Sequence, residues 1–219
     1  MKQWDSAKSL FNMMNNEYEY LIIRNFEGFF ESILLDSHAD IDILINPKDR
    51  KKLVRSLGAV PRLEKNDGIH YKVLIANDYI PFDIRTVGDG YYDKKWEESM
   101  LLNKEYNDVG FFQMNETDYY WSLLYHSLYH KGKISEEYHE RLRTISANNE
   151  EYTDFELEQM LSDYMNTNGY FYTISKDKYL WYHFSEICMG RIRSYPLYPV
   201  KKFIINCKEY LINKMRWKR

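Results

Sequence analysis

The fold of this chain is decided by a stretch that reads SHADIDILI, residues 37–45, in which two carboxylates open an otherwise apolar run. Successive side chains of a β-strand point to opposite faces, so Asp40 and Asp42 share one face and the isoleucines that follow each of them take the other. The two carboxylates then lie about 6 to 7 Å apart along the strand, and a cation between them would keep both ionised. The pattern predicts a divalent-metal site, with Mg²⁺ as the ion and Mn²⁺ as the alternative. A solvated strand end that carries two acids is the competing interpretation.

Length and composition set the broad class. The 219 residues, 26.7 kDa, suffice for one domain with a full core. A formal net charge of −3 and a pI near 6.1 give no basic excess, so we expect no nucleic-acid partner. The two cysteines, Cys188 and Cys207, lack the spacing of a metal or redox motif, which favours a reducing compartment. We find neither a signal-peptide core nor a run of roughly 18 apolar residues, and therefore expect a soluble cytoplasmic protein without a transmembrane segment.

Local patterns predict strands and helices on both sides of the acidic stretch. The second strand of an expected hairpin carries Pro81, which favours an edge position or a bulge. From about residue 117 the pattern becomes helical. We expect a helix over 5–16, a strand over 18–24 that a turn with Gly28 ends, a helix over 48–57, hairpin strands over 69–75 and 79–86, and helices over 119–130, 135–147, 153–168 and 199–217.

Asp83 extends the acidic pattern to a second strand. A lone acid in an apolar strand would be costly to bury, so it either faces water or joins a charged site. If its strand lies beside that of Asp40 and Asp42, three carboxylates meet on one face, and Arg85 shares that face. Three carboxylates and one arginine suit two metal ions and a diphosphate or triphosphate.

Aromatic and basic residues follow the strand of Asp83. A glycine-rich turn over 87–90 leads into a loop with Tyr91, Tyr92 and Trp96, which we expect at the rim of the site, stacked on a base or a sugar. Aromatic side chains that seal the core under the turn are the equal alternative. Lys94 lies in the same segment, where it could neutralise phosphate or remain a solvated surface lysine.

His126 and His130 are four residues apart on an expected helix and therefore share one of its faces. A zinc motif of that spacing requires glutamate directly after the first histidine, where this chain has Ser127. We therefore place the pair at the substrate rim, where packing or phosphate contact is favoured over metal ligation.

The order of these elements resembles the nucleotidyltransferase superfamily with the DNA polymerase β-like fold. The family pattern is a hydrophobic-Gly-Gly/Ser turn, a hydrophobic-Asp-hydrophobic-Asp/Glu pair on a strand, and a third acid on a later strand. Residues 18–90 follow this order. The resemblance implies that Asp40 and Asp42 are the metal-binding pair and that Asp83 is the third carboxylate. All three would be catalytic.

One part of the family pattern is absent from the sequence. The family turn holds nucleotide phosphates, but this chain reads NFEGF at 25–29, with neither Gly-Gly nor Gly-Ser. Candidate phosphate contacts are Gly28 and Arg24 here, and Arg85 and Lys94 further on. The runs YLIIRNFEG and VGDGYYD are similar to a poorly characterised bacterial and viral subgroup often associated with cell-surface polysaccharide genes.

The resemblance and the residue patterns together imply an α+β fold. We expect a small mixed sheet flanked by helices over 1–114, and a mostly helical portion over 115–219 packed on it. The implied function is metal-dependent nucleotidyl or phosphoryl transfer from a nucleotide donor to a small acceptor such as a sugar or sugar phosphate. One alternative is a GT-A-like glycosyltransferase that binds a nucleotide sugar through Asp40, Asp42 and Mn²⁺, which the short stretch before the motif disfavours. Another is a non-catalytic binding protein that has kept the fold.

Overall fold

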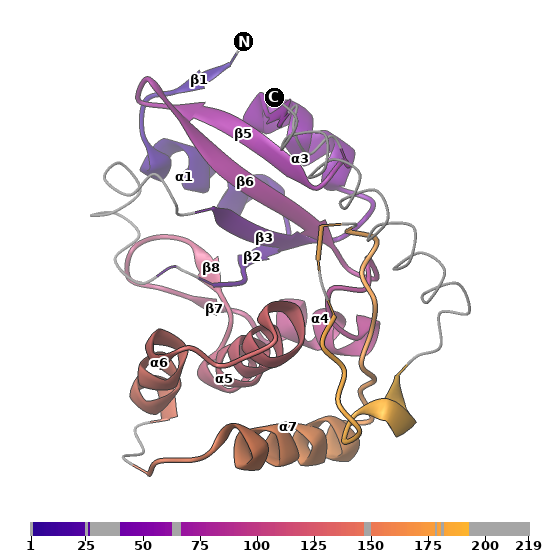
Figure 1. The fold of residues 1–219 in the computed structure, drawn as a ribbon. Helices are drawn as coiled ribbons and strands as arrows, with labels where there is room; N and C mark the ends of the chain where they lie inside the picture. Colours follow the sequence, from indigo (N-terminus) through magenta and orange to yellow (C-terminus); the bar gives the residue numbers. More distant parts are fainter. Residues whose placement is uncertain are drawn as a thin grey trace, which may run out of the picture.

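The computed structural model describes residues 2–24, 26, 40–62, 67–146, 150–177, 179–180 and 182–192. This part of the chain forms the predicted α+β fold, a mixed sheet with helices on both faces (Figure 1). The strands are β1 Gln3–Trp4, β2 Tyr20–Ile22, β3 Ile41–Ile45, β4 Val60–Pro61, β5 His70–Ile75, β6 Asp78–Thr86, β7 Glu105–Tyr106 and β8 Phe112–Gln113. The helices are α1 Ala7–Glu17, α3 Arg50–Leu57, α4 Lys94–Leu102, α5 Glu116–Tyr125, the π-helix η2 His126–Lys131, α6 Glu136–Ser146, α7 Asp154–Asn168 and the 3₁₀-helix η3 Met189–Arg191.

The strands that carry the acids are neighbours at the centre of the sheet. The strand order is β1-β5-β6-β3-β2-β8-β7, with β4 also paired to β5. β3 pairs in parallel with β6 and antiparallel with β2, and β6 pairs antiparallel with β5. The expected hairpin is confirmed, because β5 and β6 are joined by Ala76 and Asn77, which both have the positive φ that a two-residue hairpin turn requires.

The prediction of an edge position or a bulge at Pro81 is confirmed locally, because this part of β6 pairs with β5 alone among the described strands. β6 has a neighbour on each side, β5 and β3. The pairing with β3 begins only at Phe82, so Pro81 stands just before the part of β6 that is enclosed. A residue without an N–H group is tolerated there because one side of the strand still has no strand partner.

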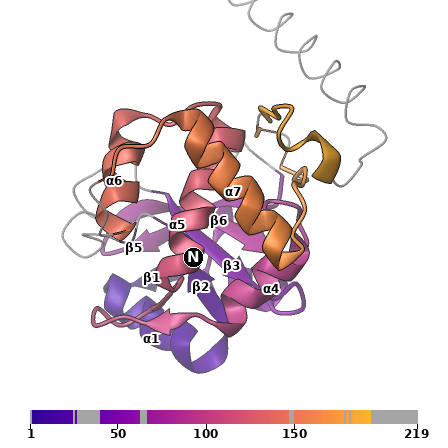
Figure 2. The same ribbon diagram turned by 90° about the horizontal axis from the view of Figure 1, so that it is seen from below.

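Two apolar cores lie on the two faces of the sheet. One joins Ile41 and Ile43 of β3 to side chains of α1 and α3. The other joins Leu44 of the same strand to side chains of α4, α5 and α7. Figure 2 shows α5 and α7 in front of the sheet on this second side. The helical half of the chain therefore shares one core with the sheet, and the alternation along β3 sends its residues into both cores.

Side-chain caps stand at the start of several of the expected helices. Ser6 caps α1, Asn115 caps α5, and Thr153 caps α7 through a capping box. Gly58 ends α3 in the left-handed conformation, and any Cβ there would lie 2.7 Å from the Cβ of Lys2. None of the helices within the described ranges is long and apolar enough to cross a lipid bilayer. Gly28, Cys207 and the expected helix over 199–217 lie outside the described residues.

One helix was not expected from the sequence. The carboxylate of Asp93 accepts a hydrogen bond from the N–H of Lys95 at 2.8 Å and so caps α4. The loop that we expected to run through Trp96 therefore ends at Asp93, and Trp96 belongs to the first turn of α4. This helix turns the aromatic side chain into the second core.

Candidate functional site

A row of three polar side chains crosses the central strands β3, β6 and β5. The Cα atom of Asp83 pairs with that of Asp42 on one side and with that of His70 on the other. Residues that face each other across neighbouring strands point to the same face of a sheet. The structure thus brings Asp42 and Asp83 together, on the face that carries Leu44 and the helical half of the chain.

Asp42 is held by Arg24, which follows the neighbouring strand β2. Its Oδ2 lies 2.9 Å from Nη2 of Arg24, and only 2% of the residue is exposed. Burial alone would lower the pKa of Arg24, but the charge of Asp42 raises it well above its ordinary value. Among the described residues, Asp42 Oδ1 has no hydrogen-bond partner, although it is buried. This oxygen is available to a ligand at little further cost in desolvation.

Asp40 stands just before β3, beyond the row. Its side chain is about one third exposed, and its Oδ1 lies 3.3 Å from Nη1 of Arg62. The second carboxylate of the pair is therefore also paired with an arginine, one that our sequence analysis did not single out.

Two further acids surround His70. Nδ1 of the imidazole lies 2.8 Å from Oδ2 of Asp67, and Nε2 lies 3.4 Å from Oδ2 of Asp83 and 3.8 Å from Oδ2 of Asp177. Burial alone would raise the pKa of Asp67, but hydrogen bonds from the N–H of Ile69 and from His70 lower it. Asp177 belongs to the segment after α7, which returns to the sheet.

Arg85 connects Asp177 to the aromatic layer. Its Nη2 lies 3.1 Å from Asp177 Oδ2, and its guanidinium carbon lies 3.7 Å from the ring centre of Tyr91. Burial alone would lower the pKa of Arg85, but Tyr91 and Asp89 raise it. Burial raises the pKa of Asp89, although Arg85 opposes this shift. Because the guanidinium group of Arg85 is buried, its charge interacts with the side chains of Asp177, Asp89 and Tyr91.

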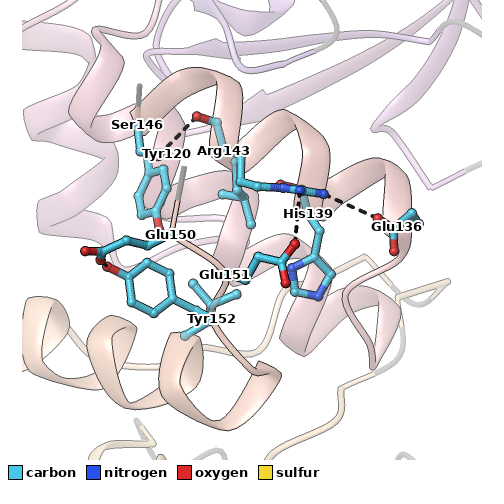
Figure 3. Close-up of a pocket in the computed structure, with 10 residues that line it drawn as sticks. Tyr120, Glu136, His139, Arg143, Ser146, Glu150, Glu151 and Tyr152 are labelled. Carbon is cyan, nitrogen blue, oxygen red and sulfur yellow. Dashed lines mark hydrogen bonds and ion pairs between the residues drawn. The ribbon is translucent and has the colours of Figure 1, made fainter. Parts of the chain in front are cut away.

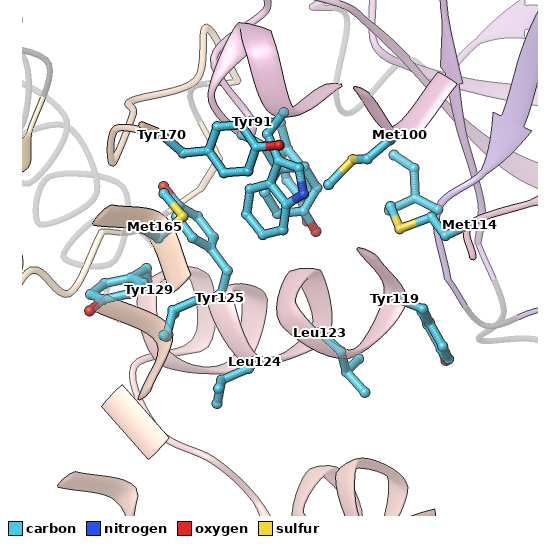
Figure 4. Close-up of a cluster of buried hydrophobic side chains, with 14 of the residues drawn as sticks. Tyr91, Met100, Met114, Tyr119, Leu123, Leu124, Tyr125, Tyr129, Met165 and Tyr170 are labelled. Atoms are coloured by element: carbon cyan, nitrogen blue, oxygen red, sulfur yellow. The ribbon is translucent and has the colours of Figure 1, made fainter. Parts of the chain in front are cut away.

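The prediction of an exposed aromatic rim is wrong. Each of its five residues is buried, and the alternative that these side chains seal the core is correct. Tyr91 lies in the second core together with Tyr125 and Tyr170 (Figure 4). A stacking platform for a base or a sugar requires an accessible ring face, which buried rings do not offer. The five residues are Tyr91, Tyr92, Trp96, His126 and His130.

The two histidines form a buried pair below Tyr91. The Tyr91 hydroxyl lies 2.8 Å from Nδ1 of His126, and this nitrogen lies 3.2 Å from Nδ1 of His130. Both histidines belong to η2, the π-helical turn that follows α5. Burial, followed by the charge of Arg24, lowers the pKa of each imidazole well below its ordinary value. The pair is therefore neutral at pH 7.

We expect this pair to make the protein less stable in mild acid. A histidine whose native pKa lies below its unfolded value near 6.5 binds its proton first in the unfolded state, so the free energy of unfolding falls as the pH drops below about 6.5. Each such group contributes up to about 1.4 kcal/mol per pH unit. Burial raises the pKa of Asp89 and Glu97, and such carboxyl groups make the free energy of unfolding rise as the pH drops. The contribution of the histidines is therefore found by comparing the pH dependence of the wild type with that of a variant that lacks one of them.

The measurement is urea unfolding of the wild type and His130→Phe between pH 7 and 5. The phenylalanine keeps an aromatic ring in an aromatic cluster and removes one titrating group. Its free energy of unfolding will fall less steeply with decreasing pH than that of the wild type. Equal slopes would contradict the buried neutral pair.

Lys94 lies apart from the buried row. Its side chain is largely exposed at the start of α4 and forms an ion pair with Glu98 at 3.5 Å. This is the arrangement of a solvated helix lysine. Among the described residues, no interaction of Lys94 supports its predicted contact with phosphate.

Oxygen ligands for a hard cation are present in the row and beside it, where Asp177 lies. The buried carboxylates of Asp42, Asp83 and Asp177 outnumber the buried guanidinium groups of Arg24 and Arg85. Carboxylate oxygens are the ligands that Mg²⁺ prefers, and the buried Oδ1 of Asp42 is without a hydrogen bond in the described part of the chain. The donor set therefore fits a divalent ion.

A separate hollow lies between α6 and the start of α7 (Figure 3). It has a volume of about 210 Å³ and is lined by charged groups that pair mainly with one another. Arg143 reaches Glu136 at 3.3 Å and Glu151 at 3.8 Å, and His139 reaches Asp154 at 3.0 Å. Because the side chains of Glu136 and Glu151 are 89% and 88% exposed, water screens their charge, and the hollow is a weaker candidate than the acidic row.

Three residues in or beside the row are not indicated by the sequence patterns above, namely His70, Asp67 and Asp177. A two-residue turn that pairs Ile75 with Asp78 also pairs His70 with Asp83, so the hairpin register could have revealed this histidine. Asp67 and Asp177 lie in irregular segments, where no periodic pattern signals a position.

Comparisons of the chain with protein-family models, with curated proteins and with solved structures found no match.

Proposed function

We propose that the protein is a metal-dependent nucleotidyl- or phosphoryltransferase that acts on a small acceptor such as a sugar or sugar phosphate. The observation that carries this proposal is the register of Asp42 with Asp83 on neighbouring parallel strands, which puts two buried carboxylates on one face. The order of β2, β3, α3 and β6 also agrees with the order in the nucleotidyltransferase resemblance.

Asp42 and Asp83 would hold the metal, with Asp40 at the outer edge of the site. A bound Mg²⁺ would neutralise phosphate charge and lower the pKa of a bound hydroxyl group. The chain itself supplies the positions of the acids. Arg24 fixes Oδ2 of Asp42 at 2.9 Å and leaves Oδ1 for the ligand. Preorganisation of this kind spares the site the cost of ordering its ligands when the substrate binds.

Asp83 is the residue that we assign as general base. It faces His70 at 3.4 Å, on the side of the row away from Asp42. A carboxylate there can accept the proton of an acceptor hydroxyl group. Arg24 and Arg85 supply positive charge beside the buried carboxylates of Asp42 and Asp177.

Calorimetric titration tests the proposal. The protein is titrated with nucleoside triphosphates and with nucleotide sugars, each with and without Mg²⁺. Transfer predicts binding of a nucleoside triphosphate that is lost when the Mg²⁺ is removed with a chelator. Preference for a nucleotide sugar with Mn²⁺ would instead support the glycosyltransferase alternative. Absence of binding to every nucleotide would overturn both.

A second candidate is a non-catalytic protein that has kept the fold. Each acid of the predicted metal pair has an arginine partner, Arg62 for Asp40 and Arg24 for Asp42. A guanidinium group can take the place of a cation in a structure that no longer binds metal. The same titration separates the two candidates, because this one predicts no heat with any nucleotide.

A further inference from the structure

The imidazole of His70 is held in a way that leaves one nitrogen directed at two acids. Asp67 accepts a hydrogen bond from Nδ1 at 2.8 Å, so the ring is fixed with Nδ1 protonated. A carboxylate on one imidazole nitrogen is the usual companion of a histidine that binds metal through the other. Nε2 then presents its lone pair to the carboxylates of Asp83 and Asp177.

The distances from Nε2 of His70 to the carboxylate oxygens of Asp83 and Asp177 match those between two ligands of one metal ion better than those of hydrogen bonds. A good N–H···O bond measures about 2.7 to 3.2 Å, whereas Nε2 lies 3.4 Å from Asp83 and 3.8 Å from Asp177. Two ligand atoms on a tetrahedral ion with bonds of about 2.0 to 2.2 Å lie roughly 3.3 to 3.6 Å apart. One ligand atom each of Asp67, His70 and Asp177 also lies within 4.8 Å of the others, so carboxylates stand close to both sides of the imidazole.

The charge of the group also calls for a cation. The carboxylates of Asp67, Asp83 and Asp177 meet here, with Arg85 at 3.1 Å from Asp177. Counting only these side chains, three carboxylates outnumber one guanidinium group and one imidazole. The side chains of His70 and Asp177 are 3% and 1% exposed, so water screens this excess poorly.

We propose that His70, Asp83 and Asp177 bind one divalent transition-metal ion of the zinc type, with Asp67 holding the imidazole in place. Imidazole nitrogen favours Zn²⁺ and its neighbours, whereas Mg²⁺ takes oxygen ligands almost alone. The site shares Asp83 with the proposed transferase centre but does not require transfer, because its other ligands lie outside that centre.

The ion would join distant parts of the chain. His70 begins β5, whereas Asp177 follows α7 and reaches the sheet on a segment that also bonds the carbonyl of Gly90 through the Thr173 hydroxyl. Binding to the native state alone raises stability with ion concentration. The ion therefore fastens the returning segment to the central strands.

The test is calorimetric titration of the full chain with Zn²⁺ alone, with Co²⁺ absorption as a second readout of nitrogen ligation. Asp118→Asn is the matched control, because it removes a buried aspartate of α5 that belongs to neither proposed metal site. We expect wild type and Asp118→Asn to bind Zn²⁺ and to melt at higher temperature with it. In His70→Gln, affinity should fall at least 100-fold and the rise in melting temperature should disappear.

Further variants separate the roles of the two supporting acids. Asp67→Asn should weaken Zn²⁺ binding by 10- to 100-fold, the usual effect of losing a carboxylate that orients a histidine ligand. Asp177→Asn should weaken it at least as much. Equal Zn²⁺ affinity in wild type and a folded His70→Gln variant would overturn the proposal. Because nucleotide is absent from this titration, that result would leave the proposed transfer standing, and loss of nucleotide binding alone would leave the zinc site standing.

Discussion

Under the proposed function, replacing Asp83 with asparagine will reduce metal-dependent transfer by about 10³-fold, within the range expected for loss of a general base. The amide has nearly the same shape as the carboxylate, but it carries no charge for the metal and accepts no proton from the acceptor. Because Asp83 lies in register with Asp42, the variant removes one of the two acids that face each other across β3 and β6. The measurement is product formation from the nucleotide identified by calorimetry.

The matched control is Asp118→Asn. Asp118 is also a buried aspartate, but it lies on α5 and accepts a hydrogen bond from the indole N–H of Trp96 at 2.8 Å. This variant tests whether loss of any buried carboxylate lowers activity through stability alone. It should keep wild-type turnover at temperatures where it is folded. Full activity of Asp83→Asn would remove this residue from the mechanism.

Replacing Trp96 with alanine will lower the free energy of unfolding by about 3 to 5 kcal/mol, the range for deleting a large aromatic side chain from a core. Trp96 is fully buried and stacks on Tyr170, with ring centres 5.5 Å apart and planes 10° from parallel. It joins α4 to the segment after α7. Urea unfolding followed by circular dichroism measures the change.

Trp96→Phe separates packing from hydrogen bonding. The smaller ring keeps most aromatic contacts but cannot donate to Asp118, which is left as a buried acceptor, so we expect a loss of about 1 to 3 kcal/mol. Alanine and phenylalanine variants of equal stability would show that the hydrogen bond matters more than the packed volume. A loss below about 1 kcal/mol in Trp96→Ala would contradict its place in the core.

The centre of the sheet could be predicted because its signals are local. Alternation along β3 fixes which residues share a face, and the short turn at Ala76 and Asn77 fixes the hairpin register. The pairing of β3 with β6 is not local, but the intervening helix α3 and its stop at Gly58 indicate a crossover to a parallel strand. The register of Asp42 with Asp83 follows from these features.

The surroundings of the acids were less predictable. Trp96 and Met100 are one helical turn apart after the cap at Asp93, so the sequence does contain the pattern of α4, which we interpreted as a loop. A run of aromatic residues near charged ones suits both a binding surface and a core, and sequence alone does not separate them. Asp177 could not be foreseen, because an irregular segment brings it to Arg85 from the far side of the helical half.

The sharing of a core between the sheet and later helices has a consequence for synthesis. The last strand of the sheet, β8, ends at Gln113, whereas much of the apolar cover of one face belongs to α5 and α7. A chain growing on the ribosome would therefore complete its strands while that face is still uncovered. The nascent sheet needs α5 and α7, which are translated later, to cover this face. A pause in translation after β8 would leave the apolar surface accessible to chaperones.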